Sequence, residues 1–249
     1  MPPPMANKRF TLKGATQNMY YPFYFDPTYV LVLIPLILAM IAQARVSGAF
    51  NRYAKVRARS NLTGAQMARM LLDSEGLQDV EIQRVGGQLS DHYDPGNQVL
   101  RLSESTYDSP SIAALGVAAH EAGHALQHRD GYGPLMLRSA AVPVANIGSN
   151  LAWPLFIMGM IFSWEPLMYA GIGLFALAVF FSLITLPVEF NASRRAMAIL
   201  ERDGYLAADE ISGAKSVLSA AALTYVASAF MAIMQLLRLV LLSQRGRRR

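Results

Sequence analysis

Four stretches without a single charged side chain restrict most strongly how this chain can fold. They contain 18, 26, 23 and 22 residues and cover 27–44, 139–164, 166–188 and 216–237. Because the hydrocarbon core of a bilayer is about 30 Å thick, an α-helix needs roughly 20 apolar residues to cross it. The sequence therefore predicts a mainly α-helical integral membrane protein. A buried helix pair in a soluble protein is the alternative, which four such runs in 249 residues disfavour.

The first three runs predict an anchor and a transmembrane hairpin. Only Glu165 separates the second run from the third, and Pro166 follows it, so these two runs form the hairpin. The first run is an anchor rather than a cleavable signal peptide, because a long leader without a short basic start precedes it. Aromatic residues at 20–25 would then form an interfacial belt. For the last run, a full span and a re-entrant helix both stay open.

The charged residues predict partners and orientation. The net charge is +5, and basic residues gather at 45–59 and 245–249, beside apolar runs. This placement favours lipid headgroups over nucleic acid. The positive-inside rule puts the region after the first run in the cytoplasm. A full span by the last run would put the Arg-rich tail outside, against the same rule. Because the sequence contains no cysteine, cysteine nucleophiles and cysteine-ligated metals are excluded.

The region between the anchor and the hairpin has mixed secondary-structure signals. A capping box at Thr63–Gln66 begins a helix that Gly76 ends. Alternation at Val80–Val85 predicts a strand, and a turn signal within Leu89–Leu102 predicts a β-hairpin. Ser109 and the proline after it are expected to be the N-cap and first turn of a helix running to about residue 128.

That helix carries the pattern His-Glu-x-x-His. Residues four apart lie on one helical face, so His120 and His124 can bind the same Zn²⁺ through their imidazole nitrogens. Glu121 is rotated by about 100° from His120 and can take a proton from a water molecule that the metal activates. The alternative is an exposed polar helix end without a metal.

A catalytic zinc site needs a third protein ligand. His128 lies about 12 Å along the helix from His120, too far to share the ion, and is expected to be a C-terminal cap or a surface residue. Glu189 directly follows an apolar run, where a lone carboxylate is costly unless it is paired or metal-bound. The alternative for Glu189 is a salt bridge to Arg194 or Arg195.

Other polar residues are weaker candidates. Glu201, Glu210 and His92 are distant alternatives for the third ligand. Asn191 and Ser193 could hydrogen-bond a ligand, or could be plain helix surface.

Four sequence blocks resemble the YugP-type neutral zinc metallopeptidases, which are prokaryotic integral-membrane proteins. The blocks are Leu89–Pro95, Val99–Glu104, Ala118–His124 and Leu186–Arg195, within a similar region of roughly 63–225. The chain is similar, more distantly, to the HtpX-like glutamate zincins. The resemblance implies that His120, His124 and Glu189 are zinc ligands and that Glu121 is the general base. In the wider glutamate-zincin pattern, an aspartate stands where this chain has Ser193.

Zincins commonly bind substrate as an extended strand along a sheet edge. Residues 91–93 would then lie at the rim of the cleft. Alternatively, Asp91 and Asp94 only organise the turn. His92, Tyr93, Arg194 and Arg195 are candidate oxyanion stabilisers.

We therefore expect a membrane-embedded zinc endopeptidase with a zincin-like catalytic helix and a small β-hairpin or sheet. It would be multi-pass in the cell membrane, with its active site towards the cytoplasm, and would act on peptides or membrane proteins. The chain is also compatible with a homo-oligomer or a membrane partner protein.

Two rival functions are a membrane scaffold with structural zinc, and a zinc transporter. The transporter is disfavoured because none of the four runs contains an acid or a histidine.

The expected organisation has seven segments: 1–27 N-terminal, 28–44 anchor, 45–138 catalytic region, 139–188 hairpin, 189–215 third-ligand helix and loop, 216–242 transmembrane or re-entrant helix, and 243–249 basic tail.

Overall fold

The computed structural model describes residues 26–87 and 89–246. The aromatic cluster at 20–25 and the last three residues of the basic tail lie outside this part of the chain. Within it, the helices are η1 Pro27–Tyr29, α1 Val30–Tyr53, α2 Gly64–Ser74, α3 Glu104–Tyr107, α4 Ile112–Arg129, α5 Gly133–Ile161, α6 Glu165–Arg202 and α7 Ala208–Gly246. The strands are β1 Glu81–Val85, β2 His92–Asp94 and β3 Val99–Ser103.

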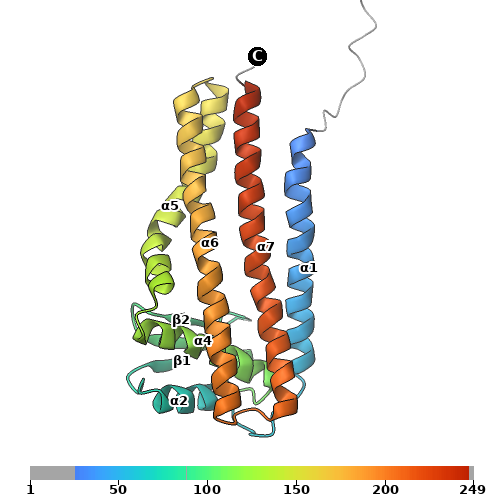
Figure 1. Cartoon of the computed structure of the whole chain (residues 1–249), viewed down its shortest axis with the longest axis vertical. Coiled ribbons are helices and arrows are strands. Elements are labelled where there is room, and N and C mark those ends of the chain that lie inside the picture. Colours follow the sequence, from blue (N-terminus) through green and yellow to red (C-terminus); the bar gives the residue numbers. More distant parts are fainter. Residues whose placement is uncertain (1–25, 88, 247–249) are drawn as a thin grey trace, which may run out of the picture.

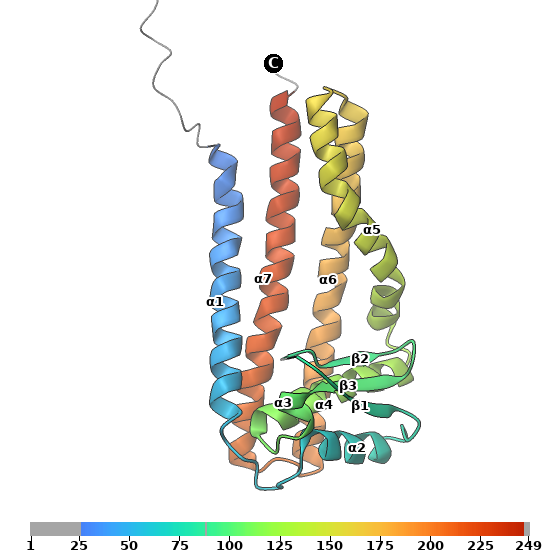
Figure 2. The ribbon, with the colours of Figure 1, turned by 180° about the vertical axis from the view of Figure 1, so that it is seen from behind.

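Four helices among the described residues are long and apolar enough to cross a membrane. They are η1 continued by α1, then α5, α6 and α7. Helices α1, α6 and α7 run along the long axis of the molecule, and α5 packs on α6 (Figures 1 and 2). The prediction of a mainly helical membrane protein with a small sheet is confirmed.

Helices α6 and α7 are longer than the apolar runs they contain. Helix α6 has 38 residues and continues past Pro187, so the segment expected to start at residue 189 begins inside it. Helix α7 is one continuous helix of 39 residues. Both therefore extend from the apolar part of the bundle into the end that carries α2, α4 and the sheet (Figure 1).

The sheet has the order β1-β3-β2. Strand β1 pairs with β3 in parallel, and β2 pairs with β3 antiparallel with Tyr93 opposite Leu100. The predicted hairpin is present, and β2 starts at His92 instead of Leu89. Because β2 is an edge strand, one of its sides is turned away from the sheet.

Of the two predicted helix N-caps, one is present and the other is displaced. Thr63 and Gln66 form the predicted capping box of α2. The prediction that Ser109 caps α4 is wrong, since Ser111 is the N-cap and its side chain accepts the backbone N–H of Ala114. Pro110 is kept out of the helix because its carbonyl accepts a backbone hydrogen bond from Ala58.

The main hydrophobic core lies at the site end of the molecule. It joins buried residues of α2, the sheet and α4 to the last turns of α6 and the first turns of α7, including Met67, Leu100, Leu115, Leu200 and Leu218. Helix α4, which carries the His-Glu-x-x-His pattern, is thus surrounded on most sides by other elements of the fold. Its residues Ile112, Leu115 and Ala119 are nearly or fully buried.

Candidate metal centre

The site depends on a close approach between α4 and α6. A Cβ on Gly123 would lie 2.7 Å from the carbonyl oxygen of Ala192, so only glycine fits at this position. Because Gly123 stands just before His124, the approach occurs beside the histidine pair. It brings Glu189, one turn earlier on α6, to the face of α4 that carries both rings.

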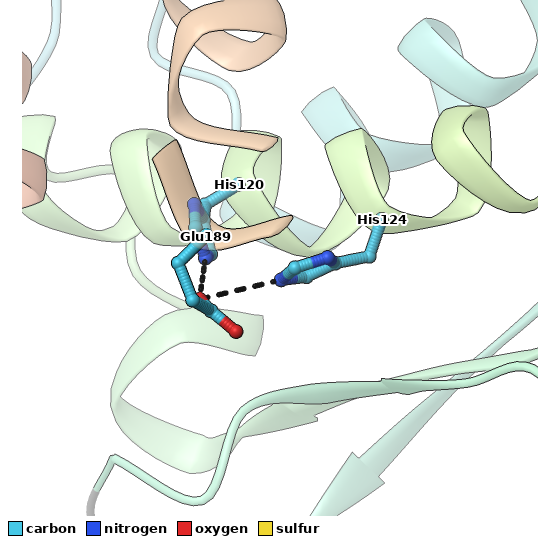
Figure 3. A group of neighbouring side chains, drawn as sticks. All are labelled: His120, His124 and Glu189. Atoms are coloured by element: carbon cyan, nitrogen blue, oxygen red, sulfur yellow. Dashed lines mark hydrogen bonds and ion pairs between the residues drawn. The ribbon is translucent and has the colours of Figure 1, made fainter. Parts of the chain in front are cut away.

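Three side chains converge where the helices cross. The Nε2 atom of His120 lies 3.2 Å from Oε2 of Glu189, and Nε2 of His124 lies 3.6 Å from the same oxygen. Figure 3 shows both rings pointing from α4 towards the carboxylate on α6. The side chain of Glu189 is only 3% exposed. Among the described residues, these three form the group of histidines and acids that can hold a metal ion.

The distances from the two imidazoles to the carboxylate fit zinc. Tetrahedral Zn²⁺ holds nitrogen and oxygen ligands at about 2.0–2.2 Å, which places neighbouring donors about 3.3 Å apart. The two nitrogen–oxygen distances, 3.2 and 3.6 Å, bracket that value, and the candidate donor atoms of all three residues lie within 4.8 Å of one another. Two imidazoles and one carboxylate are also a donor set that zinc commonly takes in catalytic sites.

Hydrogen bonds fix the tautomer of His124. The Gln127 amide nitrogen donates to the carbonyl of Val188 at 2.8 Å and to Oδ1 of Asn191 at 2.9 Å. Its other atom, Oε1, must therefore accept from Nδ1 of His124, 2.9 Å away. With the proton on Nδ1, a neutral ring offers the Nε2 lone pair to a cation. Gln127, which is fully buried, was not among the predicted residues.

Ser193 supports the other histidine. Its hydroxyl lies 3.1 Å from Nδ1 of His120. Of the two residues that the sequence offered as hydrogen-bond partners of the ligands, Ser193 contacts a histidine, whereas Asn191 contacts Gln127, the partner of His124. A neutral hydroxyl replaces the aspartate of the wider glutamate-zincin pattern.

Glu121 lies beside the cluster and lines a cavity of about 340 Å³. Its Oε2 accepts the backbone N–H of Tyr93 at 3.0 Å, so the edge strand β2 holds the carboxylate in place. The cavity is enclosed by β2, α4 and the first turns of α5, and its lining includes His124, Glu189 and Tyr225.

Two residues of this cavity were missed by sequence reasoning. Arg138 on α5 lies 3.2 Å from Oε1 of Glu189, on the side away from the histidines. Tyr225 on α7 lines the same cavity as Glu189. Neither belongs to a local pattern, and only the tertiary fold brings them to the site. The ion pair to Arg194 or Arg195, weighed as the alternative for Glu189, is made by Arg138 instead.

The remaining candidates have other roles. His128 hydrogen-bonds through Nδ1 to the Tyr93 hydroxyl at 3.0 Å. Glu210 accepts backbone N–H groups of Arg59 and Ala207. Glu201 and His92 are exposed.

The two arginines also point elsewhere. Arg194 lines a groove between α6 and α7, and Arg195 pairs with Asp130.

Asp91 and Asp94 organise the turn and its attachment to β3, which is one of the two alternatives considered for these acids. Asp91 accepts from the backbone and hydroxyl of Ser103, and Asp94 accepts from Gly96 and Asn97. Both acids also line the 340 Å³ cavity.

Charge at the site favours a cation. Burial by itself would lower the pKa of His124, but hydrogen bonding to Glu189 and the nearby charge of Glu121 outweigh it, and the pKa is raised. Two carboxylates thus direct negative potential at this ring. Nearby, hydrogen bonds from Asn97 and Arg101 hold the pKa of Asp94 well below its ordinary value. Burial and the charge of Asp94 raise the pKa of Tyr93.

A histidine pair on one helix and a glutamate from a distant apolar helix thus form a group that could hold a metal ion. A family model described as "Putative neutral zinc metallopeptidase" matches residues 28–244, and the chain belongs to this family. The chain is also 50% identical over 217 residues to the "Putative membrane protease YugP" of Bacillus subtilis (strain 168), covering 87% of this chain and 96% of that protein. No solved structure matches. The predicted family is confirmed, and membership implies Zn²⁺ as the metal.

Proposed function

We propose that this enzyme is a membrane-embedded zinc endopeptidase in which His120, His124 and Glu189 hold the metal and Glu121 is the general base. The observation that carries the proposal is the three-donor cluster beside Glu121, which lines a cavity together with His124 and Glu189. Zinc, when bound, would polarise a substrate carbonyl and make a water molecule more acidic.

Glu121 is suited to accept the proton of that water. Its residue surface is only 8% exposed, so bulk water competes little for the carboxylate. The N–H of Tyr93 holds one oxygen and leaves the other for the reacting water. The same carboxylate can then pass the proton to the leaving amine, as a general base that becomes a general acid.

We assign stabilisation of the developing oxyanion to Tyr225. Its phenol donates one hydrogen bond and lines the cavity together with Glu121 and Glu189. Of the earlier candidates, His92 is exposed and Arg195 is occupied by Asp130. Removing one such donor typically lowers kcat by about 10²–10³-fold.

The substrate would lie in extended form along β2. This edge strand and the turn after it form one wall of the cavity, opposite Leu135, Arg138 and Val142 of α5. Extended peptides add to sheet edges through main-chain hydrogen bonds, and side-chain pockets then supply selectivity.

The site would face the cytoplasm, and the substrates would be membrane proteins or peptides released at that face. The site end carries Arg52, Arg57 and Arg59, which follow the first charge-free run, and positive charge marks the cytoplasmic side. For the last apolar run, the unbroken helix α7 supports a full span over re-entry. At 1.5 Å per residue, a helix of this length extends about 58 Å, more than the bilayer needs.

The test compares wild type with Glu121→Gln and Tyr225→Phe. Purified wild type should contain about one zinc per chain and cleave a casein-type substrate. Glu121→Gln should keep the zinc and lose cleavage, because the amide cannot take the proton. Tyr225→Phe should keep the zinc, and its kcat should fall by about 10²–10³-fold while KM changes little.

Retained cleavage in Glu121→Gln would refute the base assignment. A scaffold with structural zinc predicts metal in all three proteins and cleavage in none of them. Such a scaffold also expects a closed set of four ligands, whereas the group found among the described residues has three.

A further inference from the structure

A second cavity, of about 330 Å³, adjoins the metal centre on the side away from α5. Its walls come from α1, α4 and α7, and its apolar lining includes Val46, Phe50, Val117 and Ala221. Helix α1, the predicted membrane anchor, therefore contributes side chains directly beside the metal-binding residues.

The two cavities meet over the proposed general base. Asp91, Glu121 and Tyr225 line both of them. His124 faces the first cavity and His120 the second, so a metal bound between the rings stands at the boundary. A peptide whose reacting carbonyl lies over Glu121 can therefore place the residues on its two sides in different cavities.

The cavities differ in chemistry. Arg138 and Asp94, both charged, line the first. In the second, charged side chains come only from Asp91 and Glu121, at the shared boundary, and most of the remaining lining is apolar. Its volume is at the lower end of small-molecule pockets, enough for one large side chain.

We infer that the cavity between α1, α4 and α7 is the subsite that selects a large apolar residue next to the scissile bond. This inference rests on the proposed peptidase function. Gln43, also in the lining, is the next-to-last residue of the first charge-free run, so the subsite lies where the apolar part of α1 ends. The substrates would thus be segments with a Leu- or Phe-sized residue close to the membrane surface.

Two neighbouring alanines of α7 provide a matched pair for the test. Ala221 lines the proposed subsite, and Ala222 lines the separate groove between α6 and α7. Leucine at 221 would fill the subsite, while leucine at 222 adds the same atoms to another surface. Zinc content equal to wild type verifies that each variant has folded.

The probes are non-hydrolysable phosphinic peptides that carry Ala, Leu or Phe at one or the other flanking position. Their affinities for zinc-loaded protein in lipid nanodiscs are measured by titration calorimetry. Burying a Leu or Phe side chain should favour it over Ala by about tenfold or more at one position, in wild type and in Ala222→Leu. Ala221→Leu should lose this preference and still bind the Ala peptide.

The outcomes separate the subsite from the peptidase function. Wild-type preference retained in Ala221→Leu, or no preference at either position in wild type, would overturn the subsite while the peptidase function stands. Failure of all probes to bind zinc-loaded wild type would count against the peptidase site itself, and the subsite would fall with it.

A change of cleavage pattern gives a second readout. Phe50→Ala enlarges the same cavity from the α1 side. In digests of a peptide mixture, this variant should gain cleavage beside Trp by about tenfold relative to cleavage beside Leu. An unchanged pattern would show that α1 does not shape the subsite.

Discussion

The two ends of the long helices are packed in different ways. At the site end, buried side chains of α2, the sheet, α4, α6 and α7 form one large core. At the other end, the buried cluster consists of Phe156, Met168 and Leu239. Large apolar residues there are exposed, such as Ile161 at 69% and Phe162 at 71%. Burial from water stabilises the first end, whereas the second end depends on lipid around it.

This difference predicts unequal costs for the same kind of truncation. Leu115→Ala at the site end removes a fully buried side chain, and Ile37→Ala removes one that is 55% exposed. We expect the first to lower the free energy of unfolding by about 2–5 kcal/mol, and the second by less than about 1 kcal/mol. Reversible denaturation in mild detergent measures both. Similar losses would show that the far end is as tightly packed as the core.

Glycine positions sharpen the comparison. Gly123→Ala forces α4 and α6 apart, because the new Cβ would lie 2.7 Å from the Ala192 carbonyl oxygen. Misplacing the ligands by about 1 Å should lower kcat/KM by about 100-fold. Gly173→Ala on α6 is the control, since a Cβ there would meet nothing within 4 Å. Equal activity of the two variants would mean that the close approach does not position the site.

The smallest expected effect concerns two serines of α6. Ser193→Ala removes the partner of His120 Nδ1 and should weaken zinc binding about 10–100-fold, measured by competition with a chelator. Ser182→Ala removes only a bond to the carbonyl of Ala178 in the same helix, so zinc affinity should not change. A loss in both variants would point to helix α6 as a whole rather than to the histidine contact.

Local patterns predicted the parts of the molecule that depend on neighbours in sequence. Charge-free runs predicted the apolar helices, and the four-residue spacing of His120 and His124 predicted their common face. Glu189 could be proposed because a lone carboxylate at the end of an apolar run is costly, and the structure places it with the histidines. Each of these signals acts within a few residues.

Contacts across the fold could not be predicted in the same way. Arg138 and Tyr225 come from two different helices, and nothing near either residue indicates that it faces the cavity. The N-cap of α4 moved to Ser111 because residues 56–58, distant in sequence, bind the backbone at 110–112. Tertiary hydrogen bonds of this kind override a local cap preference.

The continuity of α6 has a practical consequence. One helix carries exposed aromatic side chains such as Tyr169 and Phe180 in its first half, and further on it carries the carboxylate of the metal cluster. A water-soluble catalytic fragment therefore cannot be prepared by removing the apolar helices. Any truncation that removes the apolar first half of α6 also shortens the helix that positions the Glu189 carboxylate. Purification and assays of this peptidase belong in bilayer mimetics, where the thickness of the surrounding lipid becomes an experimental variable of its own.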